Sequence, residues 1–393
     1  MDHQGYAFDS HDRAFAVIPK IGGVLSIIGS LLILRDVFLK FKEHKTIPLT
    51  TKIMTLITVA NLALGFWENF LSTWMVPKDS NAFLASGNVT TCNLQAFVSV
   101  SMYMVVETAY TMLSALYYIT VVRKDWTTQK SQSFSVRFSF LGLPIIIGLG
   151  TAVSLLVMQQ FNFDGVYSCN IASYPLNCQY INDLPCTRAP NAAYIRAGLY
   201  IYVFACFAII IIFLSMLLYN VKKQDTETER YASEYLKGVK GEGIRSNPVA
   251  FQSLRYLTAF FIPNIAFIIW GVIDICRIEL SEHGRNVVSY IYVILWPLFG
   301  LFNSLVYFRL RYLNEKRSSP EATWSYLIGK TLSIPLLSRR RSTDETLPPH
   351  FSSLIDEDDL YSPLFEDESA YGSNEGLLSG ATTATDNDFL DAL

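Results

Sequence analysis

The sequence predicts an all-α membrane protein, in which a seven-transmembrane helix bundle is followed by a disordered cytoplasmic tail. Charged residues make up only 17% of the 393 residues, whereas an ordinary soluble domain carries about 25%. Long apolar windows recur seven times, and each reaches the roughly 20 residues that an α-helix needs to cross ~30 Å of hydrocarbon. Residues 342–393 instead carry 13 acidic side chains and neither Lys nor Arg, a composition typical of disordered segments.

The seven predicted spans share a near absence of charge over a length that suits helices, because the alternating strands of a membrane β-barrel are about half as long. The spans cover about residues 15–37, 53–75, 94–122, 138–158, 194–220, 252–275 and 287–308. They divide the chain into an extracellular N-terminus (1–14), a seven-transmembrane domain (15–312), a basic juxtamembrane segment (313–341) and the acidic tail (342–393).

Basic residues predict the orientation of the bundle. Seven spans place the two ends of the chain on opposite sides, and 24 of the 31 Lys and Arg residues fall on the side of the C-terminus. Cytoplasmic loops carry the excess of Lys and Arg in membrane proteins. We therefore expect a multi-pass protein of the plasma membrane, with its N-terminus outside and its C-terminus in the cytoplasm.

Cysteines and a glycosylation sequon gather on the predicted outer face. Cys92 begins the third span, and Cys169, Cys178 and Cys186 lie in the long loop between spans four and five. Disulfides form on the oxidising side of a membrane, so we expect two of them. Asn88 begins an Asn-Val-Thr sequon on the same face, which makes it a glycosylation candidate.

Polar side chains inside the spans are costly and usually face the interior of a bundle. In span three they recur every three or four residues, and Tyr103 and Glu107 lie in this stripe. Span two contributes Glu68, and span six contributes Trp270 and Asp274. We predict that these five residues line a ligand pocket open to the outside. The alternative is that they only hydrogen-bond between helices and fix the packing.

Several function classes fit the sequence poorly. A retinal-binding protein needs a Lys in span seven, and 287–308 has none. All five His residues lie in termini or loops, without metal-ligand spacing, so we expect no catalytic residues, no metal and no cofactor. A nucleic-acid partner is not expected either. A seven-helix channel or transporter remains the alternative, although mid-membrane charge is nearly confined to Glu107. A receptor accounts for more of the chain.

Three stretches carry a resemblance to a known family: GGVLSIIGSLLIL in span one, ALYYITVVRKDW at the inner end of span three, and WPLFGLFNSLVYFRLRY in span seven. On these stretches the chain resembles the G-protein-coupled receptors, in particular the cyclic-AMP-receptor-like group and the secretin/adhesion-type profile, over residues 15 to about 315. The Asp-Arg-Tyr motif of the rhodopsin-like receptors is absent, and Pro297 precedes Asn303 by six residues in place of a literal Asn-Pro-x-x-Tyr motif.

The resemblance implies a cell-surface receptor that transmits the binding of an extracellular ligand, whose identity the sequence leaves open, to a cytoplasmic heterotrimeric G protein. A disulfide from Cys92 would hold the outer loop, its partner being Cys169, Cys178 or Cys186. The candidate switch residues are Pro263, Pro297, Asn303 and Tyr307. The candidate residues facing the G protein are Arg123, Lys222, Arg255 and Arg309. The tail offers phosphorylation sites at Ser342 and Ser362, and kinases and arrestin-like proteins are its expected partners.

Overall fold

A computed structural model of the chain is mostly helical. The residues that it describes are 10–43, 47–80, 82–122, 133–176, 178, 185–235, 248–276, 278, 280–318, 323, 326 and 329. The predicted disordered tail, 342–393, lies outside these residues, as do most of the N-terminal segment 1–14 and most of the basic segment 313–341.

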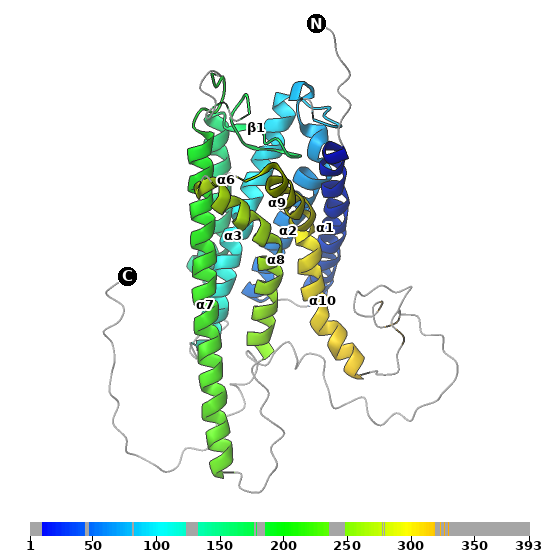
Figure 1. The fold of residues 1–393 in the computed structure, drawn as a ribbon. Helices are drawn as coiled ribbons and strands as arrows, with labels where there is room; N and C mark the ends of the chain where they lie inside the picture. The colour runs from blue at the N-terminus through cyan, green and yellow to red at the C-terminus, as the bar shows by residue number, and fades with distance from the viewer. Residues whose placement is uncertain are drawn as a thin grey trace. The chain divides into compact units, whose positions relative to one another are not determined.

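Long helices run side by side through the described part of the chain (Figure 1). The α-helices are α1 (Ser10–Glu43), α2 (Leu49–Leu64), α3 (Val89–Val122), α5 (Phe134–Arg137), α6 (Leu143–Val157), α7 (Ala192–Tyr235), α8 (Pro248–Cys276), α9 (Glu282–Leu295) and α10 (Phe299–Ser318). Two short antiparallel strands, β1 (Phe161–Phe163) and β2 (Cys169–Ile171), form a hairpin. The hairpin lies across one end of the helices (Figure 1), which we call the hairpin end.

Six helical segments of the described chain are long and apolar enough to cross a membrane. They are Arg13–Lys42, Leu49–Phe70, Val89–Val122, Phe134–Val157, Ala192–Gln224 and His283–Arg309. These six match six of the predicted spans. The predicted span 252–275 lies within α8, whose described apolar segment, Phe260–Cys276, is shorter than the other six. Membrane embedding is therefore supported by six helices.

Two predicted spans are not single regular helices. Span 287–308 is divided into α9 and α10 by the 3₁₀ turn Trp296–Leu298, because Pro297 lacks the N–H group that would continue the α-helical ladder. Span 53–75 continues from α2 into the π-helical turn Gly65–Phe70 and then into the 3₁₀ turn Ser72–Met75. The helical segments also extend beyond most predicted limits; α7, for example, is 44 residues long.

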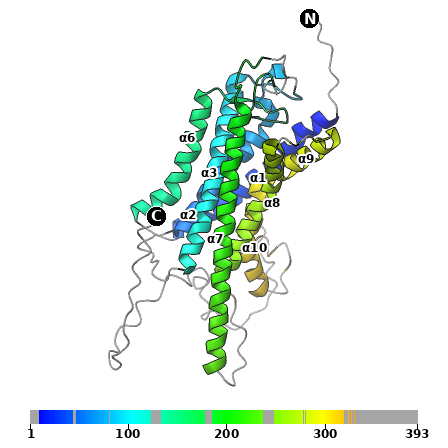
Figure 2. The same cartoon turned by 60° about the vertical axis from the view of Figure 1, so that its left-hand side comes forward.

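Helix α3 is the centre of the bundle, since it packs against α2, α6 and α7. Figure 2 shows α3 with α6 and α7 beside it. Its residues Tyr110, Leu113 and Leu116 are almost fully buried and belong to the largest hydrophobic cluster, together with Phe260 of α8 and Phe299 of α10. This core holds the helices against one another in the part of the bundle between the hairpin end and the opposite end.

Helices α1 and α10 approach each other closely because small residues face each other at their contact. A Cβ atom built on Gly29 would lie 2.8 Å from the carbonyl oxygen of Gly300. The backbone N–H of Gly300 donates a hydrogen bond to Ser26 Oγ at 2.9 Å. Small residues allow such approach between membrane helices, where van der Waals packing and hydrogen bonds stabilise association.

Candidate functional site

Glu68 lies in the π-helical turn that extends α2 towards the hairpin end. Such turns occur frequently at functional sites. Its side chain is buried, and its Oε1 atom accepts a hydrogen bond from Trp296 Nε1 at 3.2 Å. Trp296 is the first residue of the 3₁₀ turn between α9 and α10. Two irregular turns, far apart in the sequence, thus bring a carboxyl group and an indole ring together inside the bundle.

Tyr103 of α3 joins the same group through its aromatic ring. The centroid of its ring lies 5.1 Å from that of Trp296 and 5.0 Å from that of Phe267 in α8. The rings of Phe267 and Trp296 are stacked at 5.5 Å. Aromatic pairs at these separations contribute stability beyond the area they bury. The three rings therefore connect α3, α8 and the start of α10.

Glu107, one helical turn from Tyr103, is fully buried. Neither of its carboxyl oxygens has a hydrogen-bond partner among the described residues, although the Tyr103 hydroxyl lies close to the group. A buried carboxyl group without a cation or a donor is costly. In a membrane helix, a group of this kind usually marks a functional position. The structure thus brings Glu68, Tyr103 and Glu107 into one region, which we call the acidic–aromatic cluster together with Trp296 and Phe267.

Asp274 has a different environment from the cluster. Its carboxylate oxygens accept hydrogen bonds from Arg196 Nε at 2.8 Å and from Arg196 Nη2 at 2.9 Å. This two-pronged ion pair ties α8 to α7. Trp270 is partly buried one turn away in α8, and among the described residues it makes no ring contact or hydrogen bond with Glu68 or Glu107. Two of the five predicted ligand residues therefore do not contact the other three directly.

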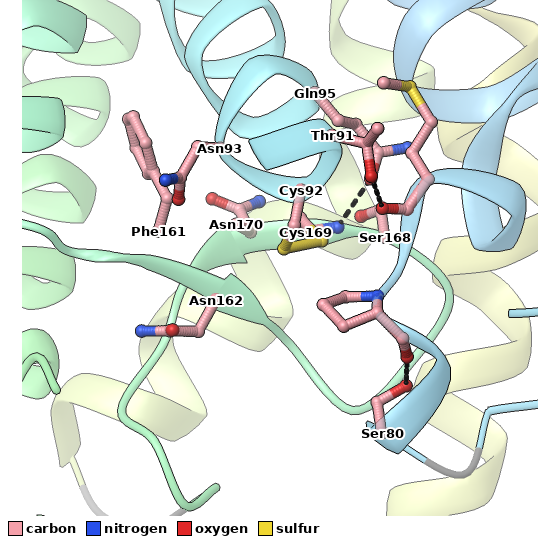
Figure 3. Close-up of a disulfide and its surroundings, with 12 residues drawn as sticks. Ser80, Thr91, Cys92, Asn93, Gln95, Phe161, Asn162, Ser168, Cys169 and Asn170 are labelled. Carbon is pink, nitrogen blue, oxygen red and sulfur yellow. Dashed lines mark hydrogen bonds between the residues drawn. A yellow bond between two sulfur atoms is a disulfide. The ribbon is translucent and has the colours of Figure 1, made fainter. Parts of the chain in front are cut away.

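The hairpin is tied to α3 by a disulfide between Cys92 and Cys169 (Figure 3). The sequence left three cysteines open as partners of Cys92, and the structure selects Cys169. The remaining two, Cys178 and Cys186, form the second disulfide. Beside the first one, Gln95 Oε1 accepts a hydrogen bond from the backbone N–H of Cys169 at 2.9 Å, drawn as a dashed line in Figure 3. The Nε2 atom of Gln95 donates hydrogen bonds to Trp67 O at 2.9 Å and to Ser72 O at 3.0 Å.

Tyr167, in the turn of the hairpin, is fully buried. Its hydroxyl donates a hydrogen bond to Asn69 Oδ1 in the π-helical turn at 3.2 Å, and its ring lies 6.2 Å from that of Tyr292 in α9. Burial raises the pKa of the nearby Asp164 carboxyl group, while hydrogen bonds from the backbone N–H groups of Val166 and Ser168 act in the opposite direction. Sequence reasoning missed Tyr167, and its place two residues before Cys169 was the available signal.

The predicted switch residues of α10 contact two different helices. Asn303 Oδ1 accepts a hydrogen bond from the Tyr110 hydroxyl of α3 at 2.6 Å. Tyr307 donates its hydroxyl to Asp36 Oδ2 of α1 at 2.7 Å, and Lys40 forms an ion pair with the same carboxylate at 3.2 Å. Both bonds lie beyond the 3₁₀ turn at Pro297 on the side away from the hairpin.

Pro263 lies inside α8, as predicted. The following residue, Asn264, is buried and donates its side-chain amide to Phe260 O at 3.0 Å. Phe260 in turn lies against Tyr110, with ring centroids 4.3 Å apart. The proline of α8 is therefore one turn from the ring that contacts the Tyr110–Asn303 pair.

The residues predicted to face a G protein are described only in part. Lys222 and Arg309 are exposed. Arg123 and the side chain of Arg255 lie outside the described residues.

The glycosylation candidate Asn88 is exposed immediately before α3. Its Oδ1 atom accepts a hydrogen bond from the backbone N–H of Thr91 at 2.9 Å, a contact typical of the residue that caps a helix N-terminus.

Comparison with known proteins does not assign a function to this site. Within the described part of the chain, no group of three or more His, Cys, Asp or Glu side chains is arranged to hold a metal ion. No protein-family model matches the chain, and no curated protein matches it.

Proposed function

We propose that the chain is a seven-span receptor of the plasma membrane that transmits the binding of an external ligand to a cytoplasmic heterotrimeric G protein. The observation that carries the proposal is the acidic–aromatic cluster, in which Glu107 is fully buried without a hydrogen-bond partner among the described residues. The buried carboxyl group lowers the stability of the free protein, and a ligand that pairs with it would explain why the group is there. Helix α8, the sixth span in chain order, completes the seven spans in this proposal, because it packs against α7, α9 and α10.

The orientation in this proposal follows from the distribution of Lys and Arg, which places the hairpin end and the N-terminus outside. One disulfide ties the hairpin to α3 and the other lies in the chain between β2 and α7, which agrees with an oxidising compartment on this side. An external ligand would then reach Glu68, Tyr103 and Glu107 from the hairpin end, while the C-terminal tail would meet kinases and arrestin-like proteins in the cytoplasm.

The coupling route begins at Trp296, which contacts Glu68 and Tyr103 and starts the segment leading into α10. A ligand that moves this ring changes the position of Asn303, which lies two helical turns further along the same face. The Tyr110–Asn303 hydrogen bond and the Tyr110–Phe260 ring contact then break, and their loss releases α8. Rotation of α8 about Pro263 opens a crevice bordered by Lys222 and Arg309, and in the prediction also by Arg123 and Arg255. A ligand drives this change only through its differential affinity for the two states.

Replacement of Asn303 tests this route. Asn303→Ala removes the acceptor of a buried 2.6 Å hydrogen bond, a loss of about 1 kcal/mol. If the bond favours one of the two states, we expect basal nucleotide exchange on a reconstituted G protein to change about fivefold. Pro263→Ala should change the same rate, because it removes the weak point of α8.

Asn220→Ala is the matched control, since Asn220 is a partly buried residue of α7 whose side-chain amide, among the described residues, donates to Met216 O of its own helix. Exchange that stays at the wild-type rate in both Asn303→Ala and Pro263→Ala would contradict the switch. An ionic current across a planar bilayer containing the purified protein would instead favour the alternative of a channel or transporter.

Glycosylation at Asn88 tests the orientation. We expect the protein made in glycosylating cells to carry an N-linked glycan, visible as a mobility shift that an endoglycosidase removes. Both Asn88→Gln and Thr90→Ala should abolish the shift, because each destroys the sequon. Asn93→Gln, a nearby Asn outside any sequon, should retain it. A wild-type protein without a glycan, while a secreted control acquires one in the same cells, would place this face on the other side of the membrane.

A further inference from the structure

Tyr167 is an aromatic side chain of the hairpin that fills a site built by the helices. The phenol has no exposed surface, although the residue belongs to a connection whose two strands have only three residues each. Its hydroxyl is held by Asn69 Oδ1, and its ring faces Tyr292. Removing this side chain from its site requires movement of the hairpin and does not require any helix to unfold.

The site that receives the phenol is set up by the helices themselves. Asn69 belongs to the π-helical turn, and its Nδ2 atom donates to Leu64 O at 3.4 Å. That bond orients Oδ1 towards the Tyr167 hydroxyl and makes it a fixed acceptor for an O–H donor. A site built to accept a hydroxyl rejects an analogue that lacks it, because the buried acceptor is then left unpaired.

The site is also continuous with the acidic–aromatic cluster. The Glu68 carboxyl group lies within electrostatic range of both Tyr167 and Tyr292, and Tyr292 stacks on Trp296 with ring centroids 5.7 Å apart. A single ring, that of Tyr292, therefore lies between the position of the Tyr167 ring and Trp296, which leads into α10.

We infer that the hairpin end of the bundle contains a binding subsite for a phenol, which the protein's own Tyr167 occupies in this structure. The external ligand carries an aromatic hydroxyl group, which enters the subsite when the hairpin withdraws Tyr167. The second statement rests on the receptor function proposed above, whereas the first concerns binding alone.

The test uses the purified full chain and p-cresol, which reproduces the Tyr side chain. Tyr167→Ala leaves a cavity with the shape of a phenol, and such cavities bind the missing group as a separate molecule. We expect p-cresol at saturation to raise the unfolding midpoint of Tyr167→Ala by about 3 °C or more, since a ligand that binds the folded state stabilises it by mass action. The wild-type protein, whose subsite is filled, should not respond.

Two comparisons establish the chemistry of the subsite. p-Xylene has the shape of p-cresol without the hydroxyl group, and we expect a smaller shift with it. The double variant Tyr167→Ala/Asn69→Leu should respond equally to both compounds, because it lacks the acceptor. A folded Tyr167→Ala protein whose midpoint is unchanged by p-cresol would falsify the subsite.

If Tyr167→Ala does not accumulate as folded protein, the yield of folded protein from cultures grown with p-cresol or with p-xylene is measured instead. A higher yield with p-cresol supports the subsite, and equal yields contradict it.

The role of the ligand is tested separately, by measuring basal G-protein activation. We expect activation to change in Tyr167→Ala and to return on addition of p-cresol. Binding of p-cresol without any effect on activation, in a protein that still responds to Asn303→Ala, keeps the subsite and overturns the phenolic ligand. If Asn303→Ala has no effect either, the receptor function fails and the subsite stands.

Discussion

Gly300→Ala should destabilise the bundle by about 1–3 kcal/mol, although alanine is the better helix former. Gly300 is the point where α10 meets α1, and a Cβ atom there would lie 2.6 Å from Ser26 O and 2.6 Å from Ser30 Oγ. The first of these is a backbone atom, so relief requires the two helices to separate. Separation also lengthens the bond from the Gly300 N–H group to Ser26 Oγ. The measurement is the unfolding midpoint of the purified protein in detergent or lipid.

The chain offers a matched control in Gly150 of α6. A Cβ atom on Gly150 meets nothing within 4 Å, so Gly150→Ala should be neutral or stabilise the protein by up to about 1 kcal/mol through helix propensity alone. Equal midpoint changes in the two variants would mean that the α1–α10 contact does not limit stability. A larger loss in Gly300→Ala shows that the close approach does.

Loss of the Cys92–Cys169 disulfide should have the second large effect. Replacing both residues with Ala releases a loop whose ends are 77 residues apart, and the chain-entropy relation gives a loss of about 4.5 kcal/mol. We also expect the hairpin to be held less firmly, because its remaining contacts with α3 are the Gln95 bond to the Cys169 N–H and the apolar packing of Phe161 and Ile171. Thermal unfolding, together with proteolysis of the connection between α6 and α7, measures both consequences.

The pair Cys178 and Cys186 is the control for this prediction, since they are only 8 residues apart. The same relation gives about 2.5 kcal/mol for that smaller loop, and the shorter ring does not hold the hairpin to α3. A double variant of Cys178 and Cys186 that costs as much as the variant of Cys92 and Cys169 would show that loop length is not what decides the stability.

The sequence was sufficient to predict the membrane helices, because the length of an apolar segment is a local property that lipid selects directly. Six of the predicted spans coincide with helices that are long and apolar enough to cross a membrane. The weak point at Pro297 was also predictable, since a missing N–H group acts locally, and a 3₁₀ turn lies there. No local feature of the sequence predicts the π-helical turn around Glu68. Such a change of backbone register depends on how the side chains pack against the rest of the bundle.

Pairwise contacts between distant residues were the part that the sequence could not supply. Asp274 was placed in a ligand pocket for its charge and position, but charge alone does not reveal a partner 78 residues away, and Arg196 takes up the carboxylate. Tyr167 lies in a connection without hydrophobic periodicity, so only its place two residues before Cys169 could have indicated that it is buried. The pairing of Cys92 likewise needed the geometry of the hairpin.

Helix α7 acts as a lever. At 1.5 Å per residue, its 44 residues give a rod of about 66 Å, roughly twice the ~30 Å of the hydrocarbon layer. The predicted span of this helix ends at residue 220, so about the last third of the rod extends beyond the span at the end opposite the hairpin. A tilt of about 10° within the bilayer would displace the far tip, near Tyr235, by roughly 6 Å. Since Arg196 and Asp274 hold the opposite end of this rod to α8, a change of tilt imposed at that ion pair is carried to the end where the helix meets water.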